Sequence, residues 1–285
     1  MNLNHASTRN DARGFSLVEM MITLSMLAVI MLMLYATLFG AQNAATETTR
    51  RAYARNSGRE AIQLIERDLR MAGSGWGTLP VQISNNGAAG TLGAITPGPA
   101  SGQSDSLRML GTFGSHSVLS TAMANAAATT TVDSIGGFNA GDFFVITNGI
   151  VAHLFNVTSV NTGTRQLAHA TSSSWNVAGG HAQFPAAPGY RVGTDVYEVT
   201  QIAYRVDSLN YRRRTLVRQE NGGIPQIVAY GVDSLKIWYR MRDGSITRSP
   251  GQIIDIREIV PILYTRSGKS ARLDSTWTYV HPRSF

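Results

Sequence analysis

The chain contains no cysteine among its 285 residues. This excludes a disulfide framework, a thiolate metal site and a cysteine nucleophile, and it leaves no cysteine-based sign of the redox compartment. Charged residues are also scarce, at 15%, whereas hydrophobic residues make up 43%. That balance excludes a chain that is disordered throughout, and the length is sufficient for a core that folds without covalent staples.

Sequence patterns typical of catalytic sites are missing as well. The six histidines form neither H-x-x-x-H nor H-E-x-x-H, the spacings with which helical histidines bind zinc. The chain also lacks the G-x-S-x-G nucleophile turn, the phosphate-binding G-x-x-x-x-G-K-[ST] loop and the EF-hand spacing. We therefore predict no catalytic residue, no metal site and no cofactor, and a protein that is not an enzyme.

One long apolar run dominates the N-terminal part. Residues 20–39 contain no charge, glycine or proline, and as a helix they would span roughly 30 Å, the thickness of a bilayer core. A buried helix of a soluble protein is one alternative, but such helices usually carry a polar stripe. A cleaved secretory signal is another, but its apolar run is shorter and a small-residue cleavage site soon follows it. The run therefore favours a transmembrane helix.

The residues before this run carry the most specific signal. They read Arg13-Gly14-Phe15-Ser16-Leu17-Val18-Glu19, which resembles the type IV prepilin signature of a basic residue, Gly, Phe, Ser or Thr, Leu, any residue and Glu before an apolar helix. The resemblance implies a leader peptide over residues 1–14, cleavage between Gly14 and Phe15 by a prepilin peptidase, and methylation of the new amine of Phe15. It also implies that Glu19 is the assembly carboxylate. A simpler alternative keeps Glu19 hydrated at the headgroups, because a carboxylate is costly to bury in a membrane.

Helical character continues beyond the membrane. Residues 41–72 contain no proline and one glycine, Gly58. Apolar residues recur from Ala61 to Ala72 at the spacing of one helix face, and Gly73-Ser74-Gly75 follows as a stop signal. The pattern predicts one helix over residues 15–72, with its first half in lipid and its second half packed on a head formed by residues 73–285.

The head is predicted to be rich in β-strands. Residues 73–190 are rich in Gly, Ala, Ser, Thr and Asn, which predicts long loops around short strands. Apolar and polar residues alternate in several later runs, which is typical of strands with one buried face. The expected strands are 142–147 and 150–160 joined by Asn148-Gly149, then 197–206, 235–241 and 253–265, the last at an edge or bulge because it contains Pro261. The fold class is α+β and type IV pilin-like, with a long N-terminal helix on an antiparallel sheet.

Positive charge gathers near the C-terminus. The net charge is +7, and residues 191–285 hold 15 basic and 9 acidic residues. Arg212, Arg213 and Arg214 form the densest cluster, with Arg218 nearby. A solvated hairpin between two strands explains such a cluster, and a patch for DNA or another polyanion is the alternative.

A second, looser resemblance concerns the end of the long helix. Residues 61–73 read AIQLIERDLRMAG, which is similar to the helix end of the PilW-type minor pilins, and residues 227–237 look like that family's strand entry. This implies a minor type IV pilin that helps initiate pilus assembly at or near the tip. Its partners would be other minor and major pilins, the prepilin peptidase, the inner membrane before assembly, and DNA or a surface ligand at the tip. The alternatives are a J-type minor pseudopilin of a type II secretion system, a pilin-anchored adhesin or DNA-binding module, and a sensor or enzyme with an uncleaved anchor.

Overall fold

The computed structural model describes residues 16–98, 104–208, 214–266 and 273–282. The chain divides into two compact units, residues 1–50 and residues 51–285. The boundary between them lies within the long N-terminal helix.

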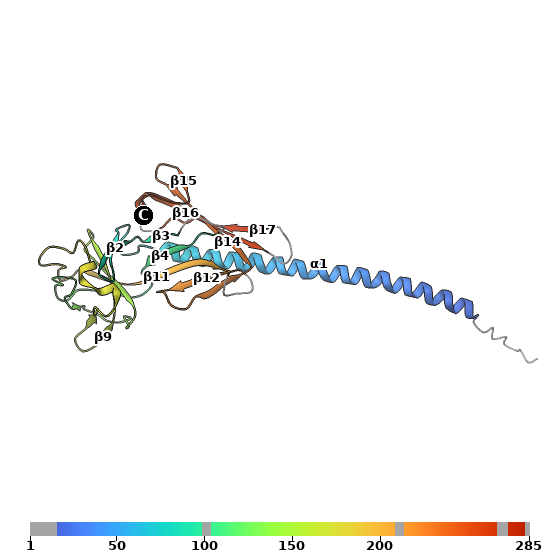
Figure 1. Cartoon of the computed structure of the whole chain (residues 1–285), viewed down its shortest axis with the longest axis horizontal. Helices are drawn as coiled ribbons and strands as arrows, with labels where there is room; N and C mark the ends of the chain where they lie inside the picture. Colours follow the sequence, from blue (N-terminus) through green and yellow to red (C-terminus); the bar gives the residue numbers. More distant parts are fainter. Residues whose placement is uncertain (1–15, 99–103, 209–213, 267–272, 283–285) are drawn as a thin grey trace, which may run out of the picture. The chain divides into compact units, whose positions relative to one another are not determined.

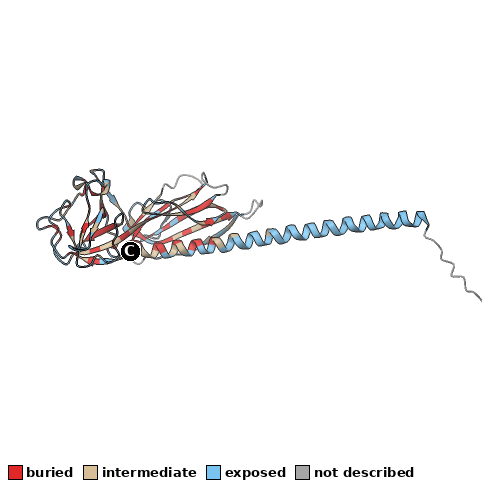
Figure 2. Cartoon of the chain, turned by 90° about the horizontal axis from the view of Figure 1, so that it is seen from below, coloured by how far each residue is buried: buried red, intermediate tan, exposed pale blue. Residues whose placement is uncertain are grey.

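The helix α1 spans Leu17–Met71 and is continuous at both Gly40 and Gly58. No proline interrupts it, and it ends where Gly73 takes a left-handed conformation with φ of 71°. The predicted helix over residues 15–72 therefore agrees with the structure to within two residues at each end. Buried residues occur only in its later half, as the colouring of Figure 2 shows: Gly58, Ala61, Ile62, Ile65, Asp68 and Leu69.

Three sheets make up most of the second unit (Figure 1). A ten-stranded sheet has the central order β13-β12-β11-β7-β8-β1-β2, and β3, β4 and β5 branch from it. A four-stranded sheet has the order β15-β14-β16-β17, and a small sheet has the order β6-β10-β9. The strands of the large sheet are β1 (Val81–Asn85), β2 (Ala88–Leu92), β3 (Ile95–Pro97), β4 (Leu107–Gly111), β5 (His116–Val118), β7 (Phe143–Thr147), β8 (Ala152–Asn156), β11 (Asp195–Asp207), β12 (Thr215–Glu220) and β13 (Gln226–Tyr230). The others are β6 (Thr130–Thr131), β9 (Ser159–Asn161), β10 (Gln166–Ala168), β14 (Val232–Met241), β15 (Ile246–Thr247), β16 (Ile256–Arg266) and β17 (Leu273–Trp277), with short 3₁₀ turns η1 (Ser174–Asn176), η2 (Ala178–Gly180) and η3 (Ile253–Asp255).

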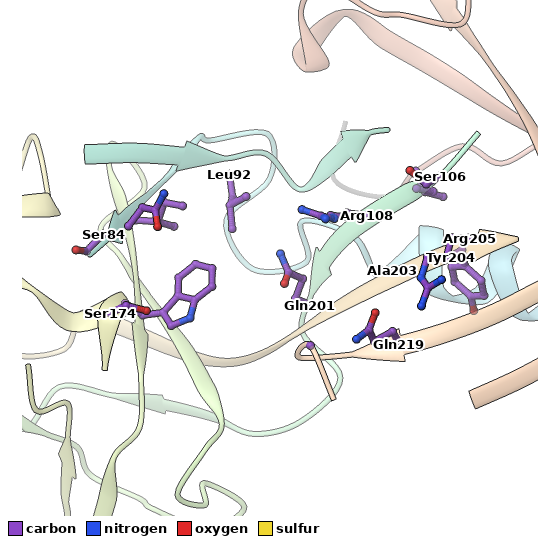
Figure 3. A pocket seen from close by; sticks show the side chains of 15 residues that line it. Ser84, Leu92, Ser106, Arg108, Ser174, Gln201, Ala203, Tyr204, Arg205 and Gln219 are labelled. Carbon is purple, nitrogen blue, oxygen red and sulfur yellow. The ribbon is translucent and has the colours of Figure 1, made fainter. Parts of the chain in front are cut away.

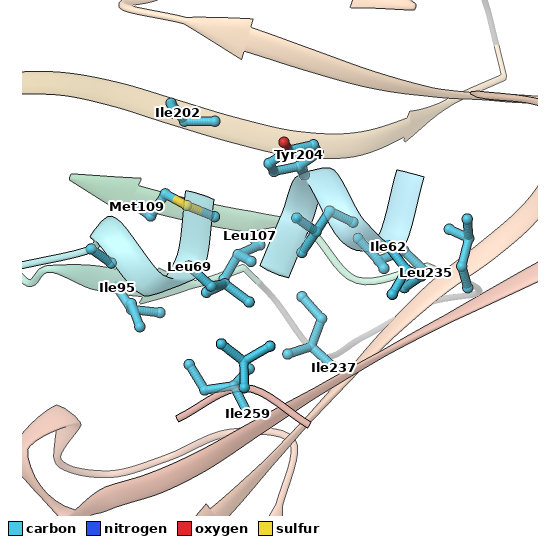
Figure 4. Packing of buried hydrophobic residues seen from close by; sticks show 14 of the residues in the cluster. Ile62, Leu69, Ile95, Leu107, Met109, Ile202, Tyr204, Leu235, Ile237 and Ile259 are labelled. Atoms are coloured by element: carbon cyan, nitrogen blue, oxygen red, sulfur yellow. The ribbon is translucent and has the colours of Figure 1, made fainter. Parts of the chain in front are cut away.

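The main core forms where the later half of α1 packs between the large sheet and the four-stranded sheet. Figure 4 shows Ile62 and Leu69 of the helix between Ile202 of β11 on one side and Ile237 of β14 on the other. These side chains are at most 3% exposed, and burial of an aliphatic side chain of this size contributes about 1.5–3 kcal/mol. The helix is thus part of the core of the head.

The predicted α+β fold is confirmed, with corrections to the sheets. We expected one antiparallel sheet on the helix, but two sheets enclose it, and the large one contains a parallel pair, β1 with β8. The expected Asn-Gly hairpin is confirmed, since β7 pairs with β8 around a four-residue loop. The predicted strand 150–160 is broken, however, because β9 leaves to pair with β10.

The expectation for Pro261 was also wrong. It lies in β16, a central strand, at a point opposite Ile237 where the register does not shift. The backbone N–H of Ile237 donates to Asp105 at 2.9 Å, on the side away from β16. Ile237 therefore faces away from β16 at this pair, and no N–H of Pro261 is needed on the side that faces β14. The pairing of β16 with β17 begins one residue later, at Ile262, so the missing N–H breaks no pair of that ladder either.

The region between β5 and β11 has a core of its own, although the composition predicted mainly loops. Phe144, Phe155 and Tyr190 are buried there beside three buried histidines, His153, His169 and His181, in one cluster. Burial is the main cause that lowers the pKa of all three histidines, and the nearby imidazole of His153 helps to lower that of His181 to about 4. Each ring contacts a backbone carbonyl, at 2.9 Å for His153. Among the described residues no group of three His, Asp or Glu is placed to hold a metal ion.

Candidate anchoring and assembly segment

The part of α1 that belongs to the first unit exposes apolar side chains on all sides of the helix. From Leu17 to Phe39 the large apolar side chains are 51–78% exposed. This stretch has a mean hydropathy of 2.4 over its most apolar window, none of which is buried, and α1 is the only helix in the described ranges long and apolar enough to cross a membrane. Soluble monomers rarely expose a continuous apolar surface of this size, so a surrounding apolar phase or neighbouring helices must cover it.

The serine and threonine side chains within residues 20–39 are already satisfied by the helix. The hydroxyl of Thr23 donates to the carbonyl oxygen of Met20 at 3.0 Å, and that of Ser25 donates to Ile22 at 2.8 Å. Thr37 donates to the carbonyl of Leu34 at 2.9 Å. An unpaired hydroxyl in hydrocarbon would cost free energy, and these bonds remove that cost. The three polar residues are therefore compatible with a transmembrane helix.

Glu19 stands in the first turn of α1 and is exposed. A negative charge there lies at the positive end of the helix dipole, which is a favourable placement. It has no hydrogen bond or ion pair with any residue that the structure describes. The predicted cleavage residues, Gly14 and Phe15, lie outside the described residues.

The helix end that resembles the PilW-type pilins contains a buried ion pair. The carboxylate of Asp68 is fully buried, and it accepts hydrogen bonds from the Tyr204 hydroxyl at 2.7 Å and from the Arg218 Nε at 2.7 Å. Arg67 adds a longer contact at 3.2 Å from the exposed side. A buried carboxylate needs such partners, because an unpaired charge in a core costs several kcal/mol. Asp68 thus fastens α1 to β11 and β12.

The electrostatics of this junction agree with its geometry. Burial would lower the pKa of Arg218, but hydrogen bonds to Asp68 and Glu220 outweigh it, and the net effect raises that pKa. Burial and then the charge of Asp68 raise the pKa of Tyr204. Both side chains therefore keep their protons and remain donors to Asp68.

A second contact of the same helix end involves Glu66. Its carboxylate accepts from the Arg70 Nη2 at 2.7 Å and from the Thr278 hydroxyl at 3.1 Å. Thr278 follows β17, so Glu66 links the helix to the four-stranded-sheet side. The charged residues of this motif therefore hold the helix between the two sheets.

This geometry corrects the predicted arginine patch. The side chain of Arg218 is only 11% exposed and is paired with Asp68 and Glu220, so it does not belong to a surface patch. Arg214 is 41% exposed in its side chain and donates to the backbone carbonyl of Asp233 at 3.0 Å. Arg212 and Arg213 lie outside the described residues.

The sequence did contain a sign of the buried carboxylate that our interpretation missed. Asp68 falls on the apolar face of the helix, three residues after Ile65 and four before Ala72. A charged residue at a core position requires a partner. The partner lies 150 residues further along the chain, and sequence spacing gives no indication of it.

The comparisons with known proteins agree with the N-terminal features. A family model described as the prokaryotic N-terminal methylation motif matches residues 9–35. The searches of curated proteins and of solved structures gave no match. The matched motif implies processing by a prepilin peptidase and assembly with other pilins, in a family that is structural rather than catalytic. Together with the exposed apolar helix and the helix-on-sheet fold, it supports a type IV pilin-like protein that is anchored in a membrane by its N-terminal helix.

Proposed function

We propose that the chain is a minor type IV pilin of the PilW kind, which helps initiate pilus assembly and sits at or near the pilus tip. The observation that carries the proposal is Glu19 in the first turn of an exposed apolar helix, inside the matched methylation motif. The helix end AIQLIERDLRMAG and a head of residues 73–285 without cysteine favour a minor over a major pilin. Before assembly the protein spans the inner membrane once, and afterwards it lies on the cell surface.

Processing would occur between Gly14 and Phe15 and leave a methylated amine on Phe15. A peptidase acting beside the membrane has room only for a small residue before the cut, so Gly14→Val should leave the full-length precursor in the membrane. Asn4→Val, elsewhere in the leader, is the control and should mature normally. Mass spectrometry of the N-terminus distinguishes the forms, and normal maturation of Gly14→Val would contradict the proposal.

Glu19 would then select the axial position of the subunit in the filament. The amine of Phe15 lies four residues before Glu19, about one helical turn away. As apolar helices bundle, an unpaired carboxylate among them would cost several kcal/mol. The amine of the same chain or that of a neighbouring pilin removes much of this cost, and a neighbour's amine can do so only when the two subunits have the right axial offset. Glu19 therefore matters for docking and not for folding or insertion.

The test is Glu19→Ala, with Glu60→Ala as a control that removes an exposed carboxylate elsewhere on the same helix. We expect Glu19→Ala to insert and to be cleaved, while fewer partner pilins co-purify with it and cells carry fewer pili. Glu60→Ala should behave as the unaltered chain. Unchanged piliation and partner recovery with Glu19→Ala would refute the role of the carboxylate.

Deletion of the whole gene tests the place of the protein in assembly. A minor pilin that starts assembly should be rare in sheared pili, and its loss should reduce pilus number much more than pilus length. If deletion instead stops protein secretion and leaves pili unchanged, the J-type pseudopilin of a type II secretion system replaces the minor pilin as the function.

A further inference from the structure

A cavity of about 520 Å³ lies on the second unit, on the face of β4, β11 and β12 that points away from α1. Residues of β11 on opposite sides of the sheet separate the two faces, because Ile202 is buried in the main core while Gln201, Ala203 and Arg205 line the cavity. Tyr204 belongs to the core and also borders the cavity. Figure 3 shows Arg108, Gln201 and Gln219 on this side of the sheet, with Leu92 of β2 and Ser174 of η1 across from them.

The strand register brings the polar side chains of the cavity together. Ala203 of β11 lies opposite Arg108 of β4 and also opposite Gln219 of β12. Residues that face each other on antiparallel strands project to the same side of a sheet, so these two long side chains flank a single methyl group. The small side chain of Ala203 leaves the floor of the cavity open between them.

Several hydrogen-bonding groups in the cavity remain available. Arg108 is exposed, and neither its guanidinium nor the side-chain amide of Gln201 has a hydrogen-bond partner among the described residues. The backbone of Gln201 is fixed by two bonds with Asn221, both of 2.8 Å. The Nε2 of Gln219 donates to Gly223 at 2.8 Å, which leaves its oxygen as an acceptor.

The opposite wall is aromatic. Trp175 of η1 lines the cavity and meets Phe143 edge to face, with ring centroids 5.3 Å apart. This contact holds the indole in place. The residues that the structure places around the cavity include Arg108 and Arg205 but no carboxylate. Arg205 is paired with Asp207 at 3.3 Å, so the charge of Arg108 is the one that favours a negatively charged ligand.

We propose that this cavity binds an acidic sugar, a saccharide unit that carries a carboxylate. A guanidinium pairs with a carboxylate through two parallel hydrogen bonds. The amides of Gln201 and Gln219 offer donors and acceptors to hydroxyl groups, and the indole of Trp175 offers a flat apolar surface to the C–H face of a sugar ring. The cavity is within the usual size range of small-ligand sites and holds one or two sugar rings. Such a site would let the head recognise acidic glycans.

The experiment uses the full chain purified in detergent and measures saturation transfer by NMR and affinity by calorimetry. The probes are glucuronic acid and N-acetylneuraminic acid, with glucose and galactose as neutral controls and adenosine monophosphate as an anion of another class. We expect binding of at least one acidic sugar, weakened by added salt, and at least about fivefold weaker binding of both neutral sugars.

Variants assign the binding to the cavity. R108Q removes the unpaired guanidinium and Q201A removes the free amide, and each should weaken binding at least about fivefold. R257Q makes the same charge change at an exposed residue of β16, outside the cavity, and should have no effect. Tryptophan fluorescence checks that each variant is folded, and Q201A carries the test if R108Q is not.

Three results would overturn the inference: no binding of either acidic sugar, equal binding of neutral and acidic sugars, or equal effects of R108Q and R257Q. Binding of the nucleotide without the sugars would show that the ligand class is wrong. The measurement does not involve cleavage or filament assembly, so failure of the proposed function would leave its outcome unchanged.

Discussion

Replacing Arg218 by methionine removes the strongest partner of a buried carboxylate and keeps most of the apolar length of the side chain. Asp68 would remain fully buried with the Tyr204 hydroxyl at 2.7 Å and with Arg67, which is 3.2 Å away and 67% exposed. Removing one member of a buried ion pair costs about 3–5 kcal/mol. Because two donors to Asp68 remain, we expect a loss near the lower end, about 3 kcal/mol.

The assay is urea unfolding of a fragment that spans residues 54–285, followed by tryptophan fluorescence. With a urea dependence of about 3 kcal/mol per molar, a loss of about 3 kcal/mol lowers the unfolding midpoint by about 1 M. Arg257→Met, an exposed arginine of β16, is the control and should change the free energy of unfolding by at most about 0.5 kcal/mol.

A double variant separates the buried charge from the packing. Asp68→Leu combined with Arg218→Met removes both charges, so it should recover most of the stability that Arg218→Met loses. Glu220→Gln should cost less than about 1 kcal/mol, because that carboxylate is 49% exposed. If Arg218→Met is as stable as Arg257→Met, Asp68 is not an uncompensated buried charge and the argument is refuted.

Three further predictions concern the same fragment. The fragment 54–285 should be soluble and monomeric, whereas the fragment 73–285 should aggregate because its two sheets lose the helix between them. A monomeric peak for 73–285 in size-exclusion chromatography would contradict this. The three buried histidines have folded-state pKa values below the unfolded value of 6.5. The unfolded chain therefore takes up protons first, and the free energy of unfolding should fall as the pH drops from 6.5 towards 4. His181→Phe should make that fall smaller, as measured by urea unfolding at each pH. Gly58→Ala should stabilise the fragment by up to about 1 kcal/mol through helix propensity, because a methyl group there would meet Thr265 at an ordinary contact distance of 3.4 Å. A lower urea midpoint of unfolding than that of the unaltered fragment would show that the position is too tight for the methyl group.

The parts of the fold that could be predicted from the sequence are those with a local cause. The helix is set by an uninterrupted run without proline and by the glycines after Ala72, and the buried face of β14 by the alternation from Leu235 to Met241. Neither feature depends on which distant segment packs against it. The order of the strands does, and for that reason the second sheet on the helix was not predicted.

The misjudged parts have in common that a distant partner decides them. Arg218 belongs to a basic cluster in the sequence, yet Asp68 draws it into the core. Pro261 was expected at an edge because proline lacks a donor, but the N–H of Ile237 opposite it donates to Asp105, away from β16, so β14 takes no hydrogen bond from Pro261 at this pair. The same distinction between local features and distant partners applies to the candidate sites. The apolar helix and Glu19 are local features, whereas the cavity beside Ala203 forms only through strand pairing.

Two of the carboxylates on the helix, Asp68 and Glu19, can be compared directly. Each lies in an apolar stretch, where an unpaired charge is costly once water is removed. Asp68 is satisfied within the chain, by Tyr204 and Arg218. Glu19 has no partner in the described part of the chain, and the hydroxyls of Thr23 and Ser25 are bonded to the helix backbone. Under the proposed function, Glu19 would be stabilised by water at the headgroups, by an amine created at Phe15, or by another subunit. Of these, only the subunit can make the free energy depend on the position of a neighbour, and that dependence is what an assembling filament requires.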